Sequence, residues 1–79
     1  GTEVFDDEER IKSITAIAGG TDATIQVDNR AVVTIPAGNA LTLSPDCTIM
    51  GSTIIFTGTT SYIVEFVTNN WYGSTRGNI

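Results

Sequence analysis

Apolar residues of this chain recur at every second position within short runs, and turn-forming residues separate the runs. In 23–28, for example, Ile25 and Val27 alternate with Thr24 and Gln26, which is the pattern of a strand with one buried face. Runs of similar length occupy 12–18, 31–35, 40–43, 47–50, 53–57 and 61–67. Gly, Pro, Asn, Asp and Ser cluster between the runs, and no segment has a helical period. The pattern predicts an all-β domain of about seven short antiparallel strands, arranged as a small β-sandwich or β-prism.

The run 61–67 differs from the others because both of its faces are largely apolar. Its even-numbered positions are Tyr, Val and Phe, whereas its odd-numbered positions include Ile63, Glu65 and Val67. A strand of this composition is expected to be covered on both sides, and a second copy of the chain is the simplest cover. Glu65 would then need a partner such as Arg30 or Arg76, from the same or a neighbouring chain, and could fix the register. The predicted oligomer interface consists of Ile63, Glu65, Phe66, Val67 and Trp71.

The size of the chain also favours self-association. With 79 residues it forms one small domain, whose single core rarely contributes more than about 3–5 kcal/mol without a further constraint. Cys47 is the only cysteine and histidine is absent, so neither an intramolecular disulfide nor a zinc site of the usual kind is expected. We therefore expect a partner chain, with no metal or other cofactor.

Charge is concentrated at the N-terminus. Five of the nine acidic residues lie among the first nine positions, and the other four acids are balanced by the four basic residues. Residues 1–10 are therefore predicted to be an acidic leader, either a solvated linker or a short helical turn, and 11–79 a single β-domain. No basic patch could hold a phosphate backbone, so nucleic acid is not an expected partner. No apolar run approaches the roughly 20 residues that would span a bilayer.

Half of the chain, from Ile35 to Ser74, resembles the C-terminal β-modules of bacteriophage tail fibres and tailspikes. The elements that carry the resemblance are Pro36-Ala37-Gly38, Leu41-Thr42-Leu43, Gly51-Ser52-Thr53 and Asn69-Asn70-Trp71-Tyr72-Gly73. Asn69 stands where the family pattern has a glycine, and asparagine also tolerates the left-handed turn. The resemblance implies a homotrimer, intertwined or side by side, that holds three fibre chains in register and contacts the host-cell surface. It also implies a virion component that folds in the host cytoplasm.

Trp71 and Tyr72 allow two interpretations. Their rings could stack on a sugar of a bacterial surface glycan, which would make the chain a carbohydrate-binding, receptor-recognition module. The alternative, which we favour, is that Trp71 packs at the end of the domain or at the subunit interface, as large amphipathic aromatic residues often do.

Catalysis is not expected. Asp22, Asp28 and Asp46 all fall on predicted turns, where aspartate is common because its side chain hydrogen-bonds to the nearby backbone. Without histidine, the usual pairing of a nucleophile with a base cannot be built from the abundant Ser and Thr. A capsid-decorating or auxiliary virion protein of the same β composition is a further alternative to the fibre module.

Overall fold

The computed structural model describes residues 1–45, 51–69 and 73–78. Its secondary structure consists of eight strands: β1 (Thr2–Val4), β2 (Glu9–Ala18), β3 (Ala23–Val27), β4 (Val33–Ile35), β5 (Ala40–Leu43), β6 (Thr53–Thr57), β7 (Thr59–Thr68) and β8 (Gly73–Asn78). The described residues include no helix, and hence none that could cross a bilayer. The prediction of an all-β chain is confirmed.

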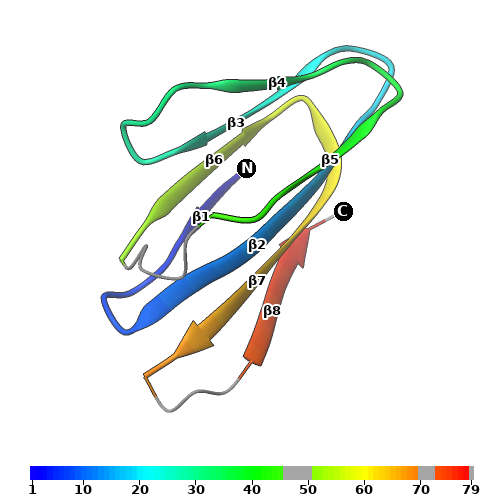
Figure 1. Ribbon diagram of the computed structural model, residues 1–79. Helices are drawn as coiled ribbons and strands as arrows, with labels where there is room; N and C mark the ends of the chain where they lie inside the picture. Colours follow the sequence, from blue (N-terminus) through cyan, green and yellow to red (C-terminus); the bar gives the residue numbers. More distant parts are fainter. Residues whose placement is uncertain (46–50, 70–72, 79) are drawn as a thin grey trace.

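The strands form two antiparallel sheets of four strands each. Sheet A has the order β1-β6-β3-β4, and sheet B has the order β5-β2-β7-β8. Figure 1 shows the chain passing repeatedly between the two sheets, so that neighbours within a sheet are often distant in sequence. β1 and β8, which come from opposite ends of the chain, are edge strands of different sheets.

The inward faces of the two sheets share one hydrophobic core. Phe56 on β6 stacks on Tyr62 on β7, with ring centroids 3.7 Å apart and an interplanar angle of 8°. Phe5 meets Phe66 edge-on at 5.2 Å. The accessible surface is 4640 Å², close to the roughly 4600 Å² expected of a monomer of this mass. The chain therefore buries its core as well as an ordinary monomer, and any reason for a partner must come from its outer surfaces.

A β-bulge near the start of β2 sets which of its residues face the core. The pairing of β2 with β7 shifts between Ile11 and Ser13, so that one extra residue is accommodated there. Ile11 and Ile14 are both fully buried although they are three positions apart, which strict alternation would forbid. The bulge thereby places Ile11, Ile14 and Ala16 on the same inward face.

The predicted leader is instead part of the fold. β1 pairs with β6 through Thr2, Glu3 and Val4, and Phe5 is 2% exposed in the core. The Phe5 N–H donates a hydrogen bond to the Ser52 carbonyl at 2.8 Å. The prediction of a separate leader over 1–10 was wrong because the acidic run hides one large apolar side chain, and burial of that ring draws the segment into sheet A.

Two further differences concern strand number. β8 was not predicted, because Gly73–Asn78 lacks alternating apolar residues and is held chiefly by its pairing with β7. The strand predicted at 47–50 lies outside the described residues. β2 and β7, with ten residues each, are longer than the predicted runs.

A single residue, Gly58, connects β6 in sheet A to β7 in sheet B. Its φ of 76° lies in the left-handed region, where residues with a Cβ atom are strained. A Cβ atom at this position would also lie 2.8 Å from the Asp22 carbonyl oxygen. Glycine is therefore required for the chain to change sheets here within one residue.

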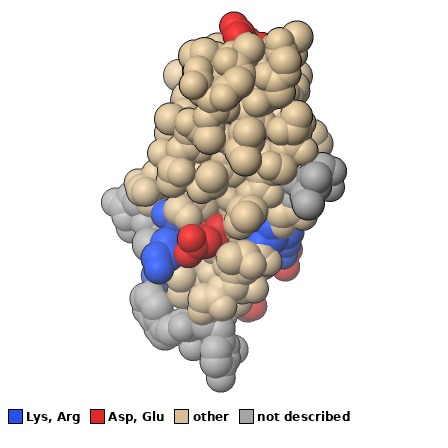
Figure 2. All heavy atoms as spheres, turned by 90° about the vertical axis from the view of Figure 1, so that its right-hand side faces the viewer, with Lys and Arg blue, Asp and Glu red and all other residues tan. Residues whose placement is uncertain are grey.

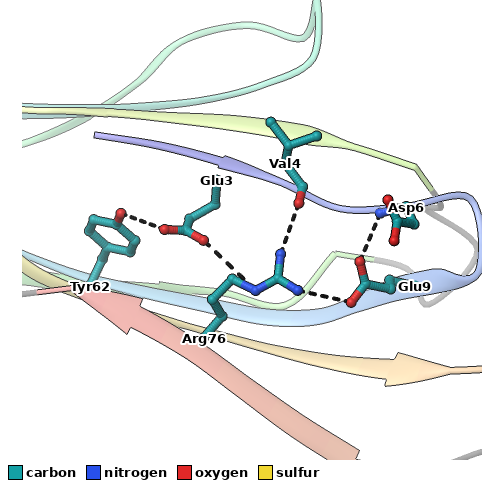
Figure 3. A network of polar contacts seen from close by, with 6 residues as sticks. All are labelled: Glu3, Val4, Asp6, Glu9, Tyr62 and Arg76. Atoms are coloured by element: carbon teal, nitrogen blue, oxygen red, sulfur yellow. Dashed lines mark hydrogen bonds and ion pairs between the residues drawn. The ribbon is translucent and has the colours of Figure 1, made fainter.

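On one open side of the two sheets, Arg76 on β8 joins strands of both (Figure 3). Its Nη1 donates to the Val4 carbonyl at 2.8 Å, and its Nη2 donates to Glu9 Oε2 at 3.0 Å. Glu3 lies 3.9 Å from Arg76 Nε and accepts a hydrogen bond from the Tyr62 hydroxyl at 2.9 Å. The guanidinium carbon also lies 4.4 Å from the centroid of the Phe5 ring. We call this arrangement the Arg76 clasp, since it links β1 of sheet A to β2, β7 and β8 of sheet B.

We expect Arg76→Met to lower the free energy of unfolding by about 1–2 kcal/mol, because charge-assisted hydrogen bonds are lost while the apolar stem is kept. Glu3 and Glu9 would also be left close together without their shared cation. Urea denaturation measures the effect, and the difference from wild type should shrink in 1 M salt because partly exposed charges are screened. Arg30→Met is the control: no ion pair of Arg30 occurs among the described residues, so its midpoint should hardly move. Equal midpoints for wild type and Arg76→Met would contradict the clasp.

Candidate self-association surface

The outward side of sheet B is a broad face on which most side chains are small and uncharged. It consists of the residues that point away from the core, in register rows across the sheet: Ala40, Ile17 and Ser61; Thr42, Thr15, Ile63 and Gly77; Ser13, Glu65 and Thr75. We call this surface the outer β7 face. Ile63 is 54% exposed and Ile17 is 43% exposed, and they lie on neighbouring strands at diagonal positions.

Threonine and glycine keep this face flat around the two isoleucines. The Thr15 and Thr42 hydroxyls hydrogen-bond to each other at 3.1 Å across β2 and β5. Gly77 on β8 stands opposite Ile63, and a Cβ atom there would lie 3.3 Å from Ile63 Cγ1. Gly73 stands opposite Val67 in the same way. At these positions β8 adds no side chain to the face, so the side chains of β7 project further from the sheet than β8 does.

Charged groups are confined to one end of the face. Glu65 is exposed on β7, Lys12 is exposed as the unpaired residue at the bulge of β2, and Arg10 on β2 stands opposite Val67. Figure 2, which views the side of the molecule at the right of Figure 1, shows a continuous area without charged residues above a band where acidic and basic side chains gather. A flat surface with exposed isoleucines and with charges toward one end is typical of a surface that is covered by a partner.

The structure brings together three of the five predicted interface residues. Ile63 and Glu65 belong to the outer β7 face, and Val67 projects from the same side of β7 in the next register row, as alternation requires. Phe66 does not: it points between the sheets and is 6% exposed, so its placement with Ile63 at an interface is corrected. The sequence showed that both faces of this strand are apolar, but the choice of inward face depends on packing against β1 and β6. Trp71 and Tyr72 lie outside the described residues.

The suggested intrachain partners of Glu65 are also corrected in part. Arg76 stands opposite Val64 and faces the core side, where it pairs with Glu3 and Glu9. No ion pair of Glu65 is found among the described residues. The carboxylate is exposed in the single chain and is therefore accessible to a partner from another copy.

The contribution of β2 and β5 to this face was missed at the sequence level. Ile17 could have been recognised from the sequence. It is a large apolar residue between Ala16 and Ala18, and alternation places it on the opposite face of the strand from these two small residues. Thr15 and Thr42 carry no such signal, because threonine is common on any exposed strand.

Other kinds of site are not supported by the described residues. They contain no cluster of three or more potential metal ligands. Asp22 Oδ1 accepts a hydrogen bond from the Ala37 N–H at 2.9 Å, and Asp28 Oδ1 accepts one from the Thr53 N–H at 2.8 Å. Asp22 and Asp28 lie in the connections on either side of β3, and their carboxylates tie these connections to distant parts of the chain.

Comparison of the chain with protein-family models, curated proteins and solved structures finds no match. The resemblance to phage fibre modules therefore depends on the short sequence elements alone.

Proposed function

We propose that this chain is a structural module that self-associates through the outer β7 face. The observation that carries the proposal is the pair of exposed isoleucines, Ile17 and Ile63, set in a flat face whose charges lie toward one end. Burial of apolar surface contributes about 25 cal/mol per Å² to the free energy of association. A second copy that covers Ile17 and Ile63 would remove their side chains from water and gain this free energy.

The sequence elements that resemble phage tail fibre and tailspike modules support a homotrimer within this proposal. In such a trimer three small β-sandwiches meet around one axis, hold the chains of a fibre in register and contact the host surface at their loops. A threefold arrangement in which the same face of each chain points to the axis forms a closed assembly. Glu65 of one chain would then approach Lys12 of a neighbour, because both lie at the same end of the face. Such a pair would select one register over others.

We expect Ile63→Glu to convert a trimer into a folded monomer. A carboxylate at the centre of a covered apolar face would be buried without a partner, at a cost of several kcal/mol. In the single chain the same side chain is exposed, so the circular dichroism spectrum should be unchanged. Light scattering at micromolar concentration should give three times 8.4 kDa for the wild type and 8.4 kDa for the variant.

Ile55→Glu provides the matched control. Ile55 is 42% exposed on the outward side of sheet A, where Val4 is its diagonal neighbour. This variant should remain trimeric. Dissociation by Ile55→Glu alone would move the interface to sheet A, and a monomeric wild type would refute self-association.

A further inference from the structure

The side of the molecule opposite the Arg76 clasp contains an apolar cavity of about 280 Å³ between the two sheets. It lies between the short edge strands β4 and β5, whose three and four residues leave the core open there. Its lining is mostly aliphatic and consists of Ile14, Ile25, Val27, Ala31, Val33 and Leu43, with Arg30, Ser44 and Pro45.

The walls define the chemistry of a ligand. An apolar cavity of about 150 Å³ stays dry and accepts benzene, so 280 Å³ could hold a larger aliphatic group. The lining contains no aromatic ring and hence no platform on which a sugar could stack. A flexible aliphatic chain matches these walls better than a glycan does.

Arg30 supplies the polar end of the site. The turn between β3 and β4 fixes its backbone: its N–H donates to the Val27 carbonyl at 3.0 Å, and its carbonyl accepts from Gln26 Nε2 at 3.2 Å. Its exposed side chain lines the cavity. Arg76, on the opposite side, is joined to Glu3 and Glu9, whereas no carboxylate among the described residues forms an ion pair with Arg30. An arginine at an apolar opening is suited to a carboxylate, which it can bind through two parallel hydrogen bonds.

We propose that this cavity binds a medium-chain aliphatic carboxylate, with the chain between the sheets and the carboxylate on Arg30. The site is separate from the outer β7 face, since its lining residues lie between the sheets and on the turn beyond β3. Binding therefore does not require self-association.

Titration calorimetry with decanoate, below its micellar concentration, tests the proposal. We expect the wild type to bind decanoate, and Arg30→Gln to weaken binding by about 10-fold or more, the usual loss for a hydrogen bond to a charged group. Decanol, which lacks the charge, should bind the wild type as weakly as decanoate binds Arg30→Gln. Val33→Phe, which fills the cavity from a half-buried edge position, should abolish binding while thermal melting shows a folded chain.

Two control variants separate the site from other effects. Lys12→Gln removes one positive charge from an exposed residue that does not line the cavity and should leave decanoate affinity unchanged. Ile63→Glu should also bind decanoate normally, so that failure of the self-association proposal does not affect this one. The proposal is overturned if the wild type does not bind decanoate at 1 mM or less, about −4 kcal/mol. It is equally overturned if Arg30→Gln and Lys12→Gln bind it alike.

Discussion

Phe66→Ala is expected to lower the free energy of unfolding by about 3–5 kcal/mol, the usual loss for a buried phenylalanine. The ring is 6% exposed, meets Phe5 edge-on at 5.2 Å, and lies 5.0 Å from the Arg76 guanidinium carbon. Its removal leaves a cavity where β1, β7 and β8 meet. Native proteins in general are stable by only about 5–15 kcal/mol, so this variant should unfold at a much lower urea concentration than the wild type at equal protein concentration.

The matched control for this prediction is Ile55→Ala. Ile55 is adjacent to the core residue Phe56 but is 42% exposed on the outward side of sheet A, so its truncation should cost less than about 1 kcal/mol. If Phe66→Ala instead gave a stable, folded monomer from a trimeric wild type, Phe66 would be an interface residue, as the sequence alone had indicated, and its position in the core would be refuted.

Gly58→Ala should lower the free energy of unfolding by about 2–3 kcal/mol. Two effects add: a left-handed conformation costs a residue with a Cβ atom about 1–2 kcal/mol, and this Cβ atom would press against the Asp22 carbonyl oxygen at 2.8 Å. Because Gly58 alone joins sheet A to sheet B, the backbone has no neighbouring loop residue that could absorb the shift. Thermal or urea unfolding measures the loss.

Two other glycines separate these effects. Gly38 has a φ of 77° but open space around its missing Cβ atom, so Gly38→Ala should cost only the conformational part. Gly20 has open space and no positive φ, so Gly20→Ala should be neutral or slightly stabilising. If Gly58→Ala and Gly38→Ala lowered the free energy of unfolding equally, the contact between the new Cβ atom at position 58 and the Asp22 carbonyl oxygen would be shown to relax without cost.

Alternation along the chain was sufficient to predict several strands but not their surroundings. The runs 23–28 and 53–57 became β3 and β6 almost within their predicted limits, because Ile25 and Phe56 fix the inward face in each. Alternation failed at Lys12, where the bulge shifts the phase of β2, and at β8, where pairing with β7 replaces the apolar signal. Such features depend on long-range pairing, which local patterns do not contain.

The candidate sites, like the strands, could be predicted only where alternation along one strand determines them. Alternation alone places Ile63 and Glu65 on one face of β7, and both are exposed there. Phe66 was misassigned because an apolar residue on either face of β7 gives the same sequence pattern. The cavity near Arg30 could not have been predicted, because it arises where the short edges of two sheets fail to meet, and no residue in either edge strand signals that gap.

The Arg76 clasp also has a consequence for the order in which the chain folds. It joins Val4 and Glu9 to a residue 72 and 67 positions later, and closing so long a loop costs entropy before any contact compensates for it. During synthesis, Glu3, Val4 and Glu9 cannot make these contacts until Arg76 has emerged from the ribosome. The pairing of β1 with β6 can form before β8 is in place, whereas the contacts of β1 with Arg76 are expected to form last.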